Sequence, residues 1–392
     1  MKKLKMVVGE PVVVAQGPTY EEVSWGPWQF PSIGRADDGR IMVSVGITPD
    51  NEMYYGADSA WFASDDEGVT WYPVSADNGA VSYTKLSNGD RISSIGVPPF
   101  KPDPKMLEGV KPVFRAEGYA DVYLVDDVDS KYVDRVWKFH RVKAGETERH
   151  EMVSRLNYWP NLSFVVTKNG VIPPFQFGRL RIAPDGSVWA TDYGHAPSPY
   201  NGEYPGSNSQ FYLRSVDNGE SWDMVSWLDP RRTEGAYLFC ESDIAWTSNG
   251  TAVTLIRGAK SYIAHSADGG ITWTDPVKFD EIGVMPAIVS LKCGALISSY
   301  GRPGFFIRAS FDPDGKVWEE PVEIIGNYDH TPEMNEECES MPGHSWGTCS
   351  YSDILPISDT EALVVYTDFF VPDEKGVKRK SLMVIKVTIV EE

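Results

Sequence analysis

The chain has 392 residues, and its 56 acidic and 36 basic side chains give a formal net charge of −20. A charge of this sign repels nucleic acid and anionic membrane surfaces, so neither is expected as a partner. No apolar run reaches the roughly 18 residues of a membrane span, so no membrane insertion is expected. The 35 Gly, 28 Pro, 13 Trp and 19 Tyr are typical of a turn-rich, aromatic-rich β protein.

The first residues leave localisation open. The segment Met1–Met6 is basic, as at the start of a signal peptide, but Gly9–Pro11 interrupts the apolar run that would have to follow. The protein is therefore expected to be cytoplasmic, or secreted or periplasmic with its leader removed. The cysteines do not decide between these: two lie in apolar strand contexts, and two flank a loop where they can pair under oxidising conditions (Cys240 and Cys293; Cys338 and Cys349).

Along the chain, six strand–turn–strand units are predicted. In each, a hydrophobic run meets a turn and a second hydrophobic run follows. The six turns lie at Asp38-Gly39, Asn88-Gly89, Asp185-Gly186, Asn249-Gly250, Cys293-Gly294 and Asp359-Thr360.

Four of these units are followed by one short signature, Ser-x-Asp-x-Gly-x-Thr-Trp or a near variant. The copies are Ser64–Trp71, Ser215–Trp222, Ser266–Trp273 and a looser Ser310–Trp318 with one extra residue. Each is predicted to be a hairpin in which the Asp caps its own turn, a Gly takes a positive φ and the Trp packs back under the loop. The second and sixth units lack the signature.

These repeats predict an all-β fold, a six-bladed β-propeller of four-stranded blades around a central channel. Because a propeller cannot be divided between blades, residues 1–392 are expected to form a single domain. One stretch, around 101–161, is rich in charge and separates the second and third turn units by nearly two blade lengths. It is interpreted as the outer strands of the second blade plus an elaborated loop.

The signature is the Asp box, or BNR repeat, and together with the six-fold repeat it resembles the sialidase (neuraminidase) superfamily over essentially the whole chain. Asp boxes are structural and occur in proteins without catalytic activity. Function must therefore be argued from the residues that face the central channel.

The resemblance assigns four of these residues. In sialidases a Glu opens an inner strand and an Arg ends the following one; here these are Glu241 and Arg257. A further Arg precedes the last Asp box, which is the position of Arg302, and the nucleophilic Tyr begins the final unit, as Tyr351 does in Cys349-Ser350-Tyr351-Ser352. Each residue also has a structural alternative. Glu241 can be a hydrogen-bond acceptor at the start of a strand, Arg257 and Arg302 can be ion-paired, and Tyr351 can be a core aromatic.

The chemistry of this set is coherent. A neutral Tyr hydroxyl avoids the charge repulsion that a carboxylate nucleophile would meet on an acidic sugar, and a neighbouring Glu can take its proton. The two arginines would bind the sugar carboxylate through their planar guanidiniums. Tyr351 as nucleophile, Glu241 as base and Arg257 with Arg302 as anion clamp predict a retaining exo-glycosidase.

Two positions depart from the family pattern or stay open. Gln29 stands where the first family Arg belongs, so the clamp lacks one charge, and Arg35, six residues on, is the nearest replacement. The family acid is an Asp on the loop before the first Asp box. Asp50 and Asp58 both lie on that loop, and Asp58 is favoured because its Gly-x-Asp context precedes a strand.

Two functions follow as hypotheses: a sialidase-like hydrolase for a terminal, acidic sugar of a glycan, or an inactive propeller that binds a glycan or a protein. Carbohydrate is the expected partner in the first. No cofactor is expected, since the chain has no nucleotide-binding motif, and no metal is expected, since the six histidines show no metal-ligand spacing. His195, after the third unit, is a candidate only for a residue at the channel mouth. Sugar, linkage and oligomeric state stay open.

Overall fold

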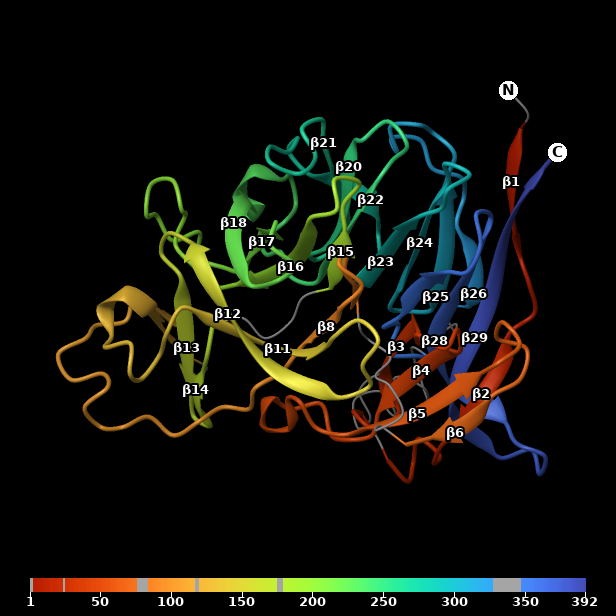
Figure 1. The fold of residues 1–392 in the computed structure, drawn as a ribbon, viewed down its shortest axis with the longest axis horizontal. Helices are drawn as coiled ribbons and strands as arrows, with labels where there is room; N and C mark the ends of the chain where they lie inside the picture. Colours follow the sequence, from red (N-terminus) through yellow and green to blue (C-terminus); the bar gives the residue numbers. More distant parts are fainter. Residues whose placement is uncertain (1–2, 24, 76–83, 117–119, 175–178, 327–346) are drawn as a thin grey trace.

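A computed structural model describes residues 3–23, 25–75, 84–116, 120–174, 179–326 and 347–392 of the chain (Figure 1). This part is all-β. The described helices are three single 3₁₀ turns: η1 (Glu52–Tyr54), η2 (Val125–Asp127) and η3 (Pro230–Arg232). No described helix has the length and apolar character needed to cross a bilayer.

Three four-stranded antiparallel sheets follow the chain directly. The first consists of β3 (Gln29–Arg35), β4 (Ile41–Gly46), β5 (Ser59–Ser64) and β6 (Tyr72–Val74). The second consists of β19 (Ser242–Trp246), β20 (Ala252–Arg257), β21 (Ser261–Ser266) and β22 (Val277–Asp280). The third consists of β23 (Val284–Ser290), β24 (Leu296–Gly301), β25 (Phe305–Ser310) and β26 (Val322–Ile325).

The largest sheet has eight strands and contains two antiparallel four-stranded units. One is β15 (Leu180–Ile182), β16 (Val188–Gly194), β17 (Ser209–Ser215) and β18 (Ser221–Leu228). The other is β7 (Thr84–Lys85), β8 (Arg91–Ser94), β11 (Val136–Val142) and β12 (Arg149–Tyr158). They join through a single parallel contact between β12 and β18.

A further four-stranded sheet is formed by β9 (Phe114–Ala116), β10 (Ala120–Leu124), β13 (Ser163–Thr167) and β14 (Gly170–Ile172). The charge-rich stretch 101–161 thus contributes β11 and β12 to the large sheet and β9 and β10 to this separate one. The elaboration also runs on past residue 161, into β13 and β14, which stand at one side of the molecule in Figure 1.

The last sheet brings the two ends of the chain together. It contains β27 (Asp353–Pro356), β28 (Glu361–Pro372) and β29 (Lys378–Glu391), and both β1 (Leu4–Val8) and β2 (Val12–Gln16) pair with β29. The two termini therefore lie side by side in Figure 1.

The predicted local structure is present. All six turns join antiparallel strand pairs: β3–β4, β7–β8, β15–β16, β19–β20, β23–β24 and β27–β28. In the first Asp signature, Asp66 accepts bonds from the backbone N–H and the hydroxyl of Thr70 at 2.8 and 2.5 Å. These bonds, with the Thr70 hydroxyl contributing most, lower the pKa of Asp66 to about 2.

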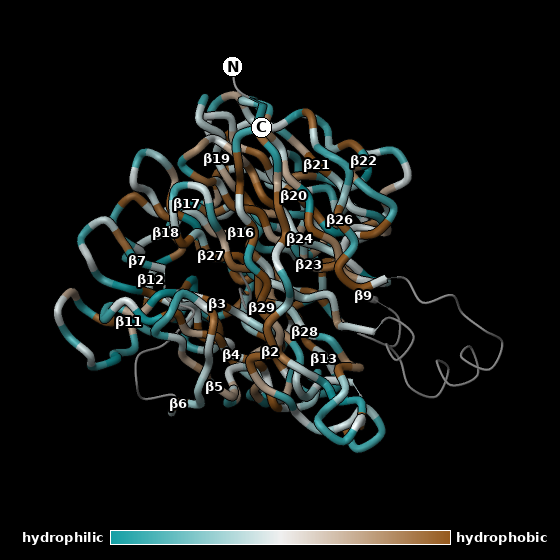
Figure 2. Tube along the Cα trace, turned by 90° about the vertical axis from the view of Figure 1, so that its right-hand side faces the viewer, coloured by the Kyte–Doolittle hydropathy of each residue, from teal (hydrophilic) through white to brown (hydrophobic). Residues whose placement is uncertain are grey.

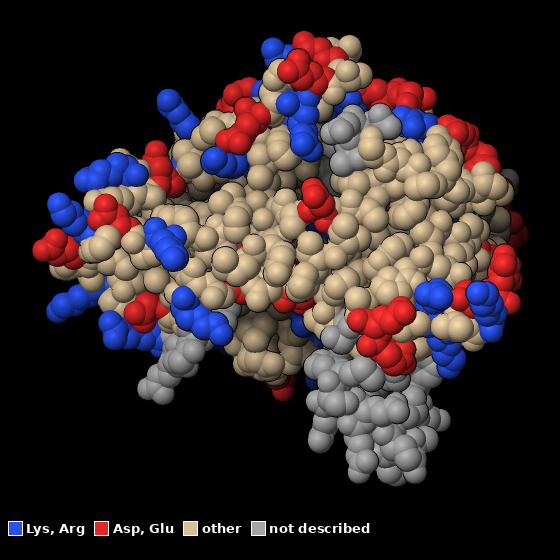
Figure 3. Space-filling model, turned by 90° about the horizontal axis from the view of Figure 1, so that it is seen from below, with Lys and Arg blue, Asp and Glu red and all other residues tan. Residues whose placement is uncertain are grey.

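The core lies between neighbouring sheets. Hydrophobic segments concentrate in the strands and hydrophilic ones in the connecting loops (Figure 2). The Asp-signature loops contribute to this packing: at Gly68, φ is +87°, and a Cβ there would lie 2.9 Å from Leu363 of the last sheet. On the face shown in Figure 3, charged side chains gather mainly around the edge.

Candidate functional site

The inner strands β3, β15, β19, β23 and β27 surround a cavity of about 1280 Å³. Its wall includes Glu241, Tyr351, Tyr193 and Met285. A second hollow of about 370 Å³ is lined by basic, acidic and aromatic residues, among them Arg257, Arg302, Tyr237 and Glu281. The sequence-predicted residues therefore line two hollows.

Glu241 and Tyr351 meet although they lie on different sheets. Glu241 immediately precedes β19 and Tyr351 lies two residues before β27. The Tyr351 hydroxyl donates a hydrogen bond to Oε1 of Glu241. The other carboxylate oxygen, Oε2, accepts from Nη1 of Arg257 at 2.7 Å and from the backbone N–H of Met285 at 3.1 Å. The carboxylate is thus held on one side and faces the phenol on the other.

The electrostatics keep Tyr351 a neutral hydroxyl. Burial, and then the negative charge of Glu241, raise the pKa of Tyr351 well above 10, although Arg257 and Arg302 oppose this shift. Burial and then Glu241 likewise raise the pKa of Tyr193. A neutral phenol bonded to a carboxylate is the arrangement in which the carboxylate can accept a proton as the phenol oxygen attacks.

Arg257 and Arg302 flank this pair. Burial opposes the charge of Arg257, yet Glu241 raises the pKa of Arg257 above its ordinary value. Arg302 follows β24 and donates from Nη2 to the carbonyl of Cys349 at 2.7 Å. Its guanidinium lies 4.9 Å from the Trp25 ring and 5.5 Å from the Tyr351 ring. Burial lowers the pKa of Arg302.

The two candidate acids have different positions. Asp50 lines the large cavity, and its Oδ2 accepts a 2.7 Å hydrogen bond from Nε1 of Trp25. Asp58 is exposed and lies outside the cavity wall. The preference for Asp58 drawn from the sequence is therefore not supported, because a Gly-x-Asp context before a strand does not determine which side of the loop the carboxylate occupies.

Gln29 and Arg35 do not join the two arginines. Gln29 is fully buried behind the cavity wall, where its Oε1 accepts from the backbone N–H of Gly26 at 3.1 Å. Its neighbour Phe30 lines the cavity instead and packs edge-on against Tyr351, with ring centroids 4.7 Å apart. Arg35 lines the cavity, but its guanidinium bonds Glu67 in the first Asp signature at 3.2 and 3.3 Å.

Backbone strain gathers at this site. Of the eight described non-glycine residues with positive φ, five carry or adjoin site side chains: Trp28, Phe30, Met285, Arg302 and Ser350. Such conformations cost about 1–3 kcal/mol each and persist where the surrounding structure imposes them, commonly at functional sites. Strands β3 and β23 also show register shifts at this end.

Several residues of the site were not anticipated from the sequence. Trp25 touches both Asp50 and Arg302, and Tyr193 lines the cavity beside Glu241. Arg179 and Arg181 also line the cavity, but their side chains bond Asp243 and not Glu241 or the Tyr351 hydroxyl. In the sequence, the dense aromatic segment around Trp25 and Trp28 is the only feature that pointed to Trp25. His195, the candidate for the channel mouth, lies outside the cavity wall, where its Nδ1 bonds the Tyr204 hydroxyl at 2.5 Å.

Three of the four cysteines lie in the described part of the chain. Cys240, Cys293 and Cys349 carry free thiols, and Cys349 is buried with its Sγ 3.1 Å from Oγ1 of Thr367. Cys338, its suggested partner, lies outside the described residues. Within the described ranges, no group of three or more His, Cys, Asp or Glu side chains is arranged to hold a metal ion.

Comparison with known proteins gives a fold likeness. No protein-family model matches the chain. No curated protein matches it either. Among solved structures, a protein of unknown function from Dyadobacter fermentans is 18% identical, with 98% of this chain and 99% of that chain covered and a TM-score of 0.61.

Two glycoside hydrolases are also similar to this chain in fold. The α-L-arabinofuranosidase Arb93A from Fusarium graminearum has 10% identity and a TM-score of 0.51, and an α-L-arabinanase from Penicillium chrysogenum has 11% and 0.50; each match covers 96% of this chain and 98% of the other. The NanB sialidase from Streptococcus pneumoniae reaches a TM-score of 0.49, too low to carry an argument. At these identities the likeness shows a shared fold alone.

Proposed function

We propose that this protein is a retaining exo-glycoside hydrolase on a six-bladed β-propeller that forms one domain. The blade count follows if the two four-stranded units of the eight-stranded sheet are separate blades that touch along β12 and β18. The sheet of β9, β10, β13 and β14 is then an elaboration of the second blade.

The observation that carries the proposal is the hydrogen bond from the Tyr351 hydroxyl to Glu241 in the wall of the large cavity. In the first step, the Tyr351 oxygen attacks the anomeric carbon while Glu241 accepts the phenol proton. The bond to the leaving oxygen breaks, and Asp50 donates a proton to that oxygen. In the second step, Asp50 takes a proton from water, the water oxygen replaces the Tyr351 oxygen, and Glu241 returns its proton to Tyr351.

The substrate class is proposed from Arg257 and Arg302. Two guanidiniums flank the nucleophile from the second hollow, and they favour a terminal sugar that carries a carboxylate. Gln29 adds no charge, which favours an acidic sugar other than sialic acid. Since solved structures with this fold include an arabinofuranosidase, furanosides belong among the sugars to be tested.

A second candidate function is a binding propeller without catalysis. It is favoured by one observation: the buried Gln29 leaves the clamp with two arginines in the described part of the chain. The same cavity would then hold a glycan end or an acidic peptide without cleaving it.

The test combines turnover with covalent trapping. Native protein is assayed on aryl sialosides, uronides and arabinofuranosides, and fluorinated glycosyl fluorides of the same sugars are used to accumulate the intermediate. We expect turnover of one class and a glycosyl adduct on the Tyr351 peptide by mass spectrometry. If no glycoside is cleaved and no adduct forms, while a glycan binds by calorimetry, the binding propeller is the correct function.

A further inference from the structure

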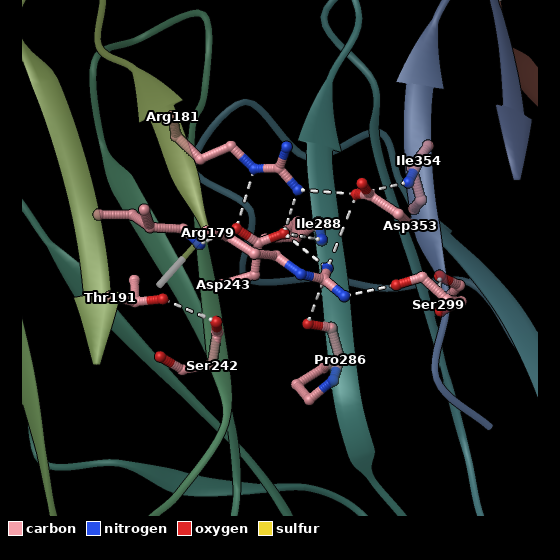
Figure 4. A network of polar contacts seen from close by, with 12 residues as sticks. Arg179, Arg181, Thr191, Ser242, Asp243, Pro286, Ile288, Ser299, Asp353 and Ile354 are labelled. Atoms are coloured by element: carbon pink, nitrogen blue, oxygen red, sulfur yellow. Dashed lines mark hydrogen bonds and ion pairs between the residues drawn. The ribbon is translucent and has the colours of Figure 1, made fainter. Parts of the chain in front are cut away.

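Two arginines and two aspartates form a cluster at the large cavity (Figure 4). Arg179, Arg181 and Asp353 line the cavity, and Asp243 lies buried among them. Arg179 lies just before β15 and Arg181 within it, Asp243 lies in β19, and Asp353 begins β27. The side chain of Asp243 is fully buried, while Arg179 and Arg181 are 12% and 21% exposed. The cluster thus links three inner strands that belong to three different sheets.

Asp243 is the centre of the cluster. It accepts hydrogen bonds from Nε and Nη2 of Arg181 at 2.9 and 2.5 Å, and from Nη1 of Arg179 at 3.2 Å. The backbone N–H of Ile288 in β23 adds a bond at 2.9 Å. Although burial opposes its charge, the two arginines lower the pKa of Asp243. Two cations facing two carboxylates therefore form a neutral, well-bonded group.

The two arginines differ in what else they contact. Besides carboxylates, Arg179 donates to two backbone carbonyls: that of Pro286 at 3.4 Å and that of Ser352. Among the described residues, the Arg181 side chain makes hydrogen bonds and ion pairs to carboxylates alone, those of Asp243 and Asp353. The two arginines are thus neighbours in one cluster with similar burial and charge, but only Arg179 also bonds backbone carbonyls.

Both carbonyls adjoin the site. Pro286 follows Met285, whose N–H holds Glu241, and Ser352 follows Tyr351. Asp243 lies two residues after Glu241. One guanidinium therefore contacts three segments that adjoin the Tyr351–Glu241 hydrogen bond, through Asp243, Pro286 and Ser352.

We propose that Arg179 is a positioning residue that sets the geometry of the Tyr351–Glu241 pair. Two of the segments that it holds contain strained backbone, with φ of +39° at Met285 and +62° at Ser350. Such conformations need contacts that impose them. The planar guanidinium fork reaches several acceptors at fixed angles, which a Lys ammonium on a flexible stem does not. The catalytic consequence rests on the proposed function; the positioning itself does not.

The test compares Arg179→Lys with Arg181→Lys, which is a matched control because it disturbs the same Asp243. Both proteins carry tyrosines labelled with ¹³C at Cζ, and the Tyr351 signal is assigned with Tyr351→Phe. In native protein this signal should shift when Glu241 is replaced by Gln. We expect Arg179→Lys to move the Tyr351 signal and remove its response to Glu241→Gln, and Arg181→Lys to leave both unchanged at a similar Tm.

An activity arm separates this proposal from the proposed function. If a glycoside is cleaved, Arg179→Lys should lower kcat on the order of 10²-fold with little change in KM, since small misplacements of reacting groups have that effect. Arg181→Lys should stay within a few-fold. If native protein cleaves nothing, the proposed function fails, and the Tyr351 signal alone decides the positioning role.

Three outcomes would overturn the proposal. The first is an equal shift of the Tyr351 signal in both Lys variants, and the second is an unchanged signal in both. Should Arg179→Lys not fold, Arg179→Gln and Arg181→Gln enter the same comparison. Failure of both Arg179 variants to fold, while both Arg181 variants fold, would assign Arg179 to folding of the sheets rather than to positioning.

Discussion

The indole of Trp25 donates a 2.7 Å hydrogen bond to Oδ2 of Asp50, and the same ring lies 4.9 Å from the guanidinium of Arg302. One side chain thus joins the candidate acid to the candidate anion clamp. The bond fixes one oxygen of Asp50 in the cavity wall. Its other oxygen, Oδ1, makes no hydrogen bond or ion pair with a described residue and is available for the proposed proton transfer to the leaving group.

Replacing Asp50 by Asn should therefore remove acid catalysis. For glycosides with poor alkyl leaving groups we expect kcat/KM to fall by about 10²–10⁴-fold, the usual contribution of general acid catalysis, with a smaller loss for nitrophenyl glycosides. Asp58→Asn is the matched control and should behave like native protein. A loss confined to Asp58→Asn would return the acid role to Asp58.

Tyr351→Phe should abolish most hydrolysis and leave Tm nearly unchanged, because the ring still fills its space and only the attacking oxygen is removed. Glu241→Gln should impair the same step. The double variant should be little worse than either single one, since the two residues act as a unit. The measurement is kcat/KM with thermal melting as control, and unchanged turnover in Tyr351→Phe would exclude Tyr351 as nucleophile.

Gln29→Arg is predicted to destabilise the protein. In the sequence Gln29 stands where the family has a clamp Arg, but in the structure it is fully buried and turned toward Gly26. A cation buried there without a carboxylate costs several kcal/mol, on the order of a broken buried ion pair. Urea unfolding should show this loss, with Gln29→Met as the uncharged control, which should lose only the roughly 1–3 kcal/mol of an unpaired Gly26 N–H. A stable variant with raised sialoside turnover would contradict this.

Lys380 should make stability depend on pH. It is fully buried, with its Nζ 5.1 and 4.9 Å from the rings of Tyr20 and Phe369, and burial lowers the pKa of Lys380 to about 8 from 10.5. Between pH 8 and 10.5 the unfolded chain binds more protons than the folded one at this residue. The free energy of unfolding should therefore rise across this window, by roughly 3 kcal/mol from this group.

Unfolding in urea at several pH values measures this effect. Lys380→Met should lack the rise that the native protein shows, whereas Lys386→Met, on the same strand but partly exposed, should keep it. Parallel pH profiles for native protein and Lys380→Met would show that Lys380 does not titrate in this window.

Local structure was predictable from the sequence because it depends on nearby residues. The six turns and the capping by Asp66 follow from short motifs whose side chains bond their own backbone. The sheet formed by β9, β10, β13 and β14 was not predictable, because β10 and β13 are separated by the whole β11–β12 hairpin. The parallel β12–β18 contact likewise depends on how two distant edges meet.

The site was predictable to the same extent. Glu241, Arg257, Arg302 and Tyr351 each occupy a fixed place in a repeat, so repeats around a common centre bring them together. Gln29 has such a place too, but the register shift after it in β3 presents Phe30 to the cavity instead. Trp25 and Arg179 act through contacts with other segments, which no local pattern records.

The pairing of β1 and β2 with β29 has a consequence for synthesis of the chain. Val12 lies opposite Val384, so the partner of β2 leaves the ribosome 372 residues later. At about 5–20 residues per second this delay is roughly 20 to 70 s. During that time the apolar β2 strand, Val-Val-Val-Ala-Gln, has an open edge that a chaperone or a second nascent chain can occupy. Yield in cells should therefore respond to translation speed more than the stability of the finished protein would suggest.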